Sequence, residues 1–315
     1  MPPLMIESER QSVRGHKLHT VTVLTEGGSP PVAVLCWHHG IGEHVGRYRE
    51  VFQRLAEEGI AVYCCDAVGH GRSEGHRAYL KSYKQAVDEF LTLCDYAAAD
   101  VARRWPGTAP PPAVIAGHSM GGLIAGLACH RNQARWAGLM LCSAALDVEM
   151  NLTLRIHAAL AGFLSKIMPR ARLVPAVKPE DMNPDPRMIE EGLNDPLNTV
   201  GKMPVGTAHQ ILRGMKRLRR HWGDFTLPLY VHHGEADKCT SAPASEAFVA
   251  AAASGDKTFY LVPGGYHEVL FTPGVGPGLV DRMAAWIKGH AAGRGVAARG
   301  ADVATGAGAG VASKL

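Results

Sequence analysis

The sequence predicts an α/β fold: a mostly parallel central sheet, helices on both faces of that sheet, and an inserted helical cap. Three observations support this fold class. Apolar runs of strand length alternate with segments of helical periodicity, several of these runs are apolar throughout, and the alternation is interrupted in only one long segment. Continuously apolar runs are typical of parallel strands that are buried on both faces.

The first part of the predicted core spans residues 1–146 and contains most of the strands. An alternating run over 18–24 predicts an antiparallel edge strand. Further strands are expected over 32–37, 60–65, 113–116 and 137–143, and helices over 47–58 and 83–104. Gly59 and Pro106 mark the ends of these two helices, because glycine often terminates a helix and proline cannot continue one.

The second part of the core, residues 223–290, follows the cap. Strands are expected over 227–231 and 257–262, with a helix over 242–253 between them and a last helix over 278–290. The cap, 147–222, is rich in proline, has no strong strand signal, and predicts an apolar helix over 152–168 and a basic helix over 213–220. The Gly/Ala-rich tail, 291–315, is expected to be flexible.

The composition excludes several classes of protein. The chain has 315 residues, of which 46% are hydrophobic and 20% charged, and its net charge of +4 is too small to indicate nucleic-acid binding. The sequence contains no run of about 18 apolar residues, so it predicts no transmembrane helix. The amino-terminal residues do not resemble a secretory signal. The 7 cysteines lie mostly in apolar runs, which predicts reduced thiols and neither a disulfide framework nor a metal site.

Residues 117–121 form the most informative motif of the chain. They read G-H-S-M-G and lie between a predicted strand and a run of small residues that predicts a helix. A serine in such a strand-turn-helix is a nucleophile elbow, whose flanking glycines relieve crowding around a strained backbone. We therefore expect Ser119 to be the catalytic nucleophile. The alternative is a glycine-rich turn that only packs a helix closely on a strand.

A nucleophilic serine needs a general base, and two late loops offer a base and its acid partner. His267 follows the last predicted strand, and Asp237 follows the strand before it. The carboxyl ends of parallel strands meet at one edge of a sheet, so both side chains are expected beside Ser119. His267 would accept the serine proton, and Asp237 would orient the imidazole. Glu235, two residues earlier, is the alternative acid.

Two backbone N–H groups are expected to stabilise the oxyanion of the tetrahedral intermediate. One belongs to Met120, directly after the nucleophile. The other belongs to Ile41, in the loop after the first long strand, where Gly40 and Gly42 allow the backbone to approach a ligand closely. Together with the serine, the histidine and the acid, these donors would complete an ester-hydrolysing site.

Taken together, these stretches resemble the monoacylglycerol lipases of the α/β-hydrolase superfamily. The resemblance covers roughly residues 18–290 and is most specific over 39–48 and 66–75. The stretch 117–122 would suit the whole superfamily, and 195–197, 234–237 and 265–267 match as well. It implies an α/β-hydrolase fold and a serine hydrolase that releases fatty acid and glycerol from a lipid ester, without a cofactor or a metal. It also implies that Ser119, Asp237 and His267 form the triad and that Ile41 and Met120 are the oxyanion donors.

The same resemblance indicates residues that contact the substrate. Glu43, His44 and Arg47 match the polar loop close to the glyceryl end of the family's site, although an ion pair or hydrogen bond that stabilises the loop is an equal alternative. Animal members carry a second histidine where this chain has Leu270, so recognition of the glyceryl group is expected to differ. Lysophospholipases, phenolic-ester esterases, acyl transfer to another alcohol, and a non-catalytic binding module stay open as alternatives.

Apolar residues recur at helical spacing within the cap, at Leu152, Ile156, Leu160, Phe163 and Ile167. For an enzyme that acts on lipid esters, the first four are predicted to bind the substrate by lining an acyl tunnel. The alternatives are contact with a membrane or lipid droplet, and simple packing on the core.

The chain ends Ser313-Lys314-Leu315, which matches a peroxisomal address that is read by an import receptor. The flexible tail would keep this tripeptide accessible. We therefore expect a peroxisomal location with the import receptor as a partner; an inert tail on a cytoplasmic enzyme is the alternative.

Overall fold

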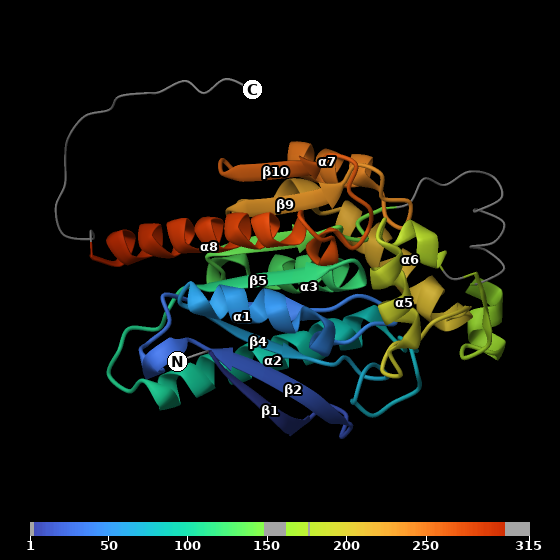
Figure 1. Cartoon of the computed structure of the whole chain (residues 1–315), viewed down its shortest axis with the longest axis horizontal. Coiled ribbons are helices and arrows are strands. Elements are labelled where there is room, and N and C mark those ends of the chain that lie inside the picture. The colour runs from blue at the N-terminus through green and yellow to red at the C-terminus, as the bar shows by residue number, and fades with distance from the viewer. Residues whose placement is uncertain (1–2, 148–161, 176, 300–315) are drawn as a thin grey trace.

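An eight-stranded sheet forms the centre of the molecule (Figure 1). The computed structural model describes residues 3–147, 162–175 and 177–299. The strands of this sheet are β1 (Leu4–Gln11), β2 (Lys17–Leu24), β3 (Ala33–His38), β4 (Ile60–Cys65), β5 (Ala113–His118), β6 (Gly138–Cys142), β9 (Leu229–Gly234) and β10 (Lys257–Val262). Their order is β1-β2-β4-β3-β5-β6-β9-β10; β2 is antiparallel to both of its neighbours, and the remaining pairs are parallel. The predicted mostly parallel sheet is confirmed.

The position of β2 differs from the prediction of an edge strand. β2 is antiparallel, as expected, but it lies inside the sheet, between β1 and β4. β1 forms the edge and pairs with β2 along the whole of its length. Every residue of β1 is exposed or half-buried, so its sequence lacks the apolar alternation that marks a strand with one buried face.

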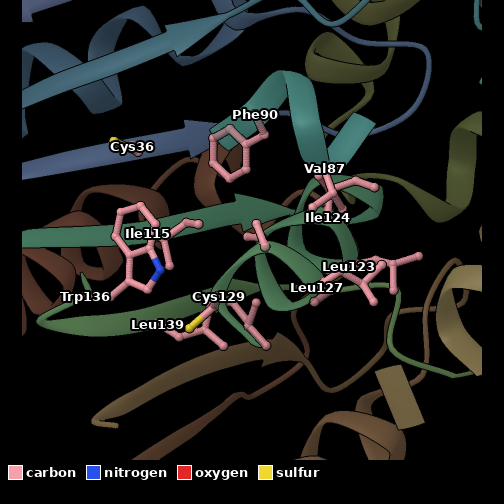
Figure 2. Packing of buried hydrophobic residues seen from close by; sticks show 14 of the residues in the cluster. Cys36, Val87, Phe90, Ile115, Leu123, Ile124, Leu127, Cys129, Trp136 and Leu139 are labelled. Atoms are coloured by element: carbon pink, nitrogen blue, oxygen red, sulfur yellow. The ribbon is translucent and has the colours of Figure 1, made fainter. Parts of the chain in front are cut away.

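Helices cover both faces of the sheet, as predicted (Figure 1). α1 (Arg49–Glu57) and α8 (Gly276–Arg299) pack on one face, and α2 (Tyr83–Arg104), α3 (Met120–Arg131) and α7 (Ala242–Ala251) pack on the other. On this second face Ile115 of β5 and Leu139 of β6 belong to the same buried cluster as Phe90 of α2 and Ile124 of α3 (Figure 2). Because both faces are covered, all residues of β3 and β6 are buried, which explains their continuous apolar runs.

The described part of the chain between β6 and β9 lies over the carboxyl ends of the parallel strands (Figure 1). Its described elements are a helical segment at 162–167, β7 (Arg172–Val174), α5 (Pro186–Asn194), β8 (Met203–Pro204) and α6 (Val205–Arg219). β7 and β8 form a small antiparallel sheet that the sequence did not predict, because such short strands show no period. The predicted basic helix corresponds to the end of α6. The limits of the cap, 147–222, stay a prediction.

Several sequence predictions concern residues that the structure does not describe. Leu152, Ile156 and Leu160 lie outside the described residues, and so does the tripeptide at 313–315. The acyl-tunnel role of the first three and the peroxisomal address therefore stay predictions. Across 3–147, 162–175 and 177–299, no helix combines the length and the apolar character needed to cross a membrane.

Asp66, directly after β4, connects the amino-terminal strands to the loops at the carboxyl end of the sheet. Its Oδ1 accepts a hydrogen bond from Val45 N at 2.8 Å, and its Oδ2 accepts one from Arg72 N at 2.8 Å. The same Oδ2 lies 3.1 Å from His19 Nδ1 on β2. Burial raises the pKa of Asp66, but the hydrogen bond from His19, the nearby His39 and the two backbone donors outweigh burial and lower the pKa to about 2.

We expect Asp66→Asn to lower the free energy of unfolding by about 2 kcal/mol near pH 7, because the amide offers no charge to these donors. The pKa of Asp66 is depressed in the folded state. Its stabilisation is therefore present above the ordinary pKa of 3.8 and is lost as the pH falls toward about 2. Urea unfolding of both proteins near pH 7 and at about pH 3 measures the difference, which should narrow at the lower pH. A difference that does not depend on pH would contradict this account.

Candidate active site

Ser119 occupies the turn between β5 and α3, with φ 54° and ψ −121°. A positive φ is strained for any residue other than glycine. The turn forms because α3 comes very close to both β5 and β3. A Cβ on Gly117 of β5 would lie 2.4 Å from the backbone of Gly121, and one on Gly121 of α3 would lie 2.1 Å from the carbonyl oxygen of His38 on β3. No side chain fits at either position, so both glycines of the motif are required sterically. This strained strand-turn-helix has the geometry of a nucleophile elbow.

His267 and Asp237 lie beside each other after the last two strands. His267 Nδ1 is 2.8 Å from Asp237 Oδ2, and both side chains are almost completely buried. Burial raises the pKa of Asp237, but attraction to His267 and hydrogen bonds from His233 and His267 bring it below its ordinary value. The ionised carboxylate accepts from Nδ1–H, which leaves Nε2 as the basic nitrogen of His267. Glu235, the alternative acid, instead accepts a hydrogen bond from Gly264 N at 2.9 Å.

Ser119 and His267 both line a cavity of about 670 Å³ beneath the segment that follows β6. Small-molecule sites typically have volumes of about 300–1,000 Å³. Much of the wall is apolar and comes from α5, α6 and the loops beside them, with Met182, Met188, Ile189, Leu193, Met203, Ile211 and Met215. The cavity therefore combines a polar reactive end with a wall suited to hydrocarbon.

The two residues whose N–H groups are predicted to bind the oxyanion also line this cavity. Ile41 and Met120 are both among the residues of its wall. A Cβ on Gly40 would lie 3.1 Å from Ser119 Cβ, so the loop after β3 passes directly against the serine. The two predicted donors therefore flank Ser119, and the hydrogen bonds that they make with a substrate stay a prediction.

Glu43 joins the loop after β3 to the elbow. Its Oε1 accepts hydrogen bonds from Gly40 N and from Tyr48 Oη, the latter at 2.7 Å, and lies 2.9 Å from His118 Nδ1. The other ring nitrogen of His118 lies 3.3 Å from the carbonyl oxygen of His267. Both nitrogens of His118 face acceptors. Burial lowers the pKa of His118, but the carboxylate of Glu43 outweighs burial and raises the pKa above its ordinary value, which favours the doubly protonated ring. Burial raises the pKa of Glu43, but the charge and the hydrogen bond of His118 place it below its ordinary value.

Two further polar contacts hold the same loop. Arg47 Nη1 and Nη2 lie 2.5 and 3.1 Å from the carboxylate oxygens of Glu268, the neighbour of His267. His44 Nε2 lies 2.7 Å from Asp195 Oδ2, which follows α5. The loop after β3 is therefore attached both to the loop that carries His267 and to the segment above the cavity.

The structure divides the residues that were predicted to bind substrate. Glu43 and Arg47 line the large cavity, but protein partners engage their charged groups, and His44 lines a separate small cavity. Phe163 is 60% exposed and, in the part of the chain that the structure describes, stands outside the cavity wall. Among the described residues, much of the apolar wall comes from α5, α6 and the loops beside them, and no residue of 162–167 belongs to it.

Two polar residues next to Asp237 were missed by the sequence analysis. Thr240 Oγ1 lies 2.8 Å from Asp237 Oδ2, and His233 Nε2 lies 3.1 Å from the same oxygen. Asp237 Oδ1 accepts hydrogen bonds from Cys239 N at 2.7 Å and Thr240 N at 3.0 Å. Aspartate often accepts from N–H groups shortly after it, so the turn itself has a sequence signal. His233 has none, because only the fold brings its ring to Asp237.

The site combines an elbow serine with a histidine–aspartate pair at one cavity, on the carboxyl edge of a parallel sheet. This combination defines a serine hydrolase with the α/β-hydrolase fold. Residues 29–274 match the family described as serine aminopeptidase, S33. The chain belongs to this family of α/β hydrolases.

Named relatives confirm the predicted resemblance. The chain is 31% identical to the monoacylglycerol lipase of Mycolicibacterium smegmatis over 260 residues, which cover 82% of this chain and 89% of that protein. It is 29% identical to the monoglyceride lipase of Homo sapiens over 237 residues, 75% of this chain and 76% of that protein. The structure of a soluble variant of monoglyceride lipase from Saccharomyces cerevisiae has a TM-score of 0.79 and 19% identity, and covers 92% of this chain and 96% of that one, which shows the same fold.

We expect Glu43→Gln to lower kcat/KM by about 10- to 100-fold with every ester, because small displacements of catalytic groups are this costly. The three partners share the single oxygen Oε1, and a glutamine would offer them an uncharged amide oxygen in its place. Its NH2 group would face the guanidinium of Arg47 where Oε2 now lies, and His118 would lose its counter-ion. The measurement is steady-state kcat/KM for a monoacylglycerol and for an aryl ester that has no glyceryl group.

Glu235→Gln is the matched control, because this exposed glutamate accepts its hydrogen bond at the surface. Equal losses with both esters in Glu43→Gln would mean that Glu43 positions the site. A loss confined to the monoacylglycerol would contradict this account and make Glu43 a ligand of the glyceryl group.

Proposed function

We propose that the protein hydrolyses monoacylglycerol to fatty acid and glycerol through an acyl-serine intermediate. The observation that carries the proposal is the shared cavity. Ser119 and His267 face it, Asp237 is hydrogen-bonded to His267, and much of the remaining wall is apolar. Such a cavity suits a substrate with a long hydrocarbon chain and one reactive ester. Relatives that are named as monoacylglycerol or monoglyceride lipases support this substrate class.

Each residue has a defined part in the proposed reaction. His267 Nε2 accepts the proton of Ser119 as the serine oxygen forms a bond to the ester carbonyl carbon. Asp237 stabilises the imidazolium, and the N–H groups of Ile41 and Met120 donate to the oxyanion. His267 returns its proton to the glyceryl oxygen, which leaves as glycerol. A water that is deprotonated by the same histidine then hydrolyses the acyl-serine.

Hydrolysis of lysophospholipids is the second candidate, because the charges of the cavity wall favour it. Arg172, Lys178 and Lys202 line the cavity, whereas the two glutamates of the wall are paired with Arg47. The wall therefore carries an excess of positive charge, which would attract a phosphate headgroup.

Ser119→Ala is expected to reduce turnover of monoolein by about 10³-fold or more and to leave the Tm unchanged, because only one hydroxyl is removed. A fluorophosphonate probe should label the unmodified protein and not the variant. Retention of turnover by the variant would end the proposal. Failure of the unmodified protein to react with the probe would favour a non-catalytic binding module.

A comparison of kcat/KM for monoolein, lysophosphatidylcholine, an anionic lysophospholipid and an aryl ester tests the substrate class. We expect monoolein to be the best substrate. Lys178→Ala and Lys202→Ala should change its kcat/KM by less than about twofold, because the substrate carries no charge. If the anionic lipid is the best substrate and both variants weaken its hydrolysis, lysophospholipase activity replaces the first candidate. Added glycerol in the same assays reports acyl transfer through its ester product.

A further inference from the structure

A second histidine contacts the carboxylate of Asp237. His233, near the end of β9, has its Nε2 3.1 Å from Asp237 Oδ2, the oxygen that also lies 2.8 Å from His267 Nδ1. On its other side, His233 Nδ1 lies 2.8 Å from Ser245 Oγ of α7. The side chains of His233 and Asp237 are 0% exposed. The contacts thus run without interruption from Ser245 through His233 and Asp237 to His267.

These partners determine which nitrogen of His233 carries a proton. Nε2 lies 3.1 Å from both Asp237 Oδ2 and Thr240 Oγ1, and the Thr240 hydroxyl has acceptors of its own in Ser143 O and Asp237 Oδ2. The ionised carboxylate of Asp237 has no proton to donate, so His233 Nε2 supplies the proton in their contact. Nδ1 is then an acceptor and takes the hydrogen bond of the Ser245 hydroxyl. Ser245 therefore selects the tautomer of His233 that can donate to Asp237, because a bond at one ring nitrogen decides which of the two is protonated.

We infer that His233, held by Ser245, is a positioning residue that orients Asp237 and moderates its basicity toward His267. A hydrogen bond to a carboxylate disperses its negative charge, so less of that charge acts on the imidazolium of His267. Without the bond from His233, Asp237 would hold the imidazolium more strongly, and His267 would act as a base only at higher pH. The inference rests on the proposed catalytic roles of His267 and Asp237.

Other ionisable groups lie around His267 and stay in place in the variants described below. The charged ring of His118 has its centroid 4.8 Å from that of His267 and is paired with Glu43. His232 lies on β9, and Arg47, in the segment after β3, is paired with Glu268 in the loop after β10. Lys238 and Cys239 lie in the loop after β9, and Lys238 is paired with Asp181 of η4 (Pro179–Asp181). A change seen only on substitution of His233 therefore reports on its contact with Asp237.

The test is the pH dependence of kcat/KM with an aryl ester. We expect His233→Leu to move the acidic limb of the profile up by about 0.5 to 1 pH unit and to lower the plateau about 3- to 10-fold. His233→Gln, whose amide N–H can still donate to Asp237, should move the limb by less than half as much. His232→Leu is the matched control. This neighbouring histidine is equally buried and packs on Tyr230, and neither of its ring nitrogens has a hydrogen-bond partner among the described residues.

An acidic limb that stays in place in His233→Leu while the Tm falls would overturn the inference, and so would an equal shift in His232→Leu. If His233→Leu does not fold, Ser245→Ala carries the test, because it removes the group that selects the tautomer. The acidic limb of the pH profile of Ser245→Ala should move in the same direction by a smaller amount. An acidic limb that does not move in this variant overturns the inference. Ser119→Ala in the same assay keeps the two proposals separate: its loss of turnover upholds the proposed function whatever the His233 variants show.

Discussion

The turn at Ser119 exists only because α3 approaches β5 and β3 with no side chain between them. At Gly117 and Gly121 a Cβ would lie within 2.4 Å and 2.1 Å of backbone atoms. This close approach brings the serine and the first N–H groups of α3 to the carboxyl edge of the sheet. The loops after β3, β9 and β10 begin at the same edge, because these strands run parallel to β5. The other parts of the site are arranged around the elbow.

Buried charges hold those loops in register with the elbow. The pair of Glu43 with His118 connects the loop after β3 to the end of β5, and the pair of Arg47 with Glu268 connects it to the loop of His267. A buried ion that loses its partner is strongly destabilising, so these pairs resist a partial rearrangement of the loops. Asp237 is held in the same way. Its carboxylate accepts hydrogen bonds from two backbone N–H groups and contacts His233, His267 and Thr240.

Much of the fold was predictable because its signals are strong along the chain. The strands over 60–65 and 257–262 and the helix over 83–104 have the predicted limits, since turn residues or proline flank clear apolar patterns. β1, β7 and β8 were missed, because an exposed edge strand and very short strands leave no period to detect. Of the residues expected to line an acyl tunnel, the structure describes Phe163 and places it at the surface.

The sequence by itself determined the alternation of strands and helices, the G-x-S-x-G turn, and the position of a histidine and an acid after the last two strands. These are local properties, since periodicity and turn chemistry depend on residues that are close along the chain. The tertiary structure alone decided that Asp237, and not Glu235, meets His267, and that Glu43 is engaged by His118. It also decided that, in the part of the chain it describes, α5 and α6 supply much of the apolar wall. Asp237 and His267 are 30 residues apart in the sequence, and Glu43 and His118 are 75 residues apart. Only the packing of whole elements brings such distant residues together.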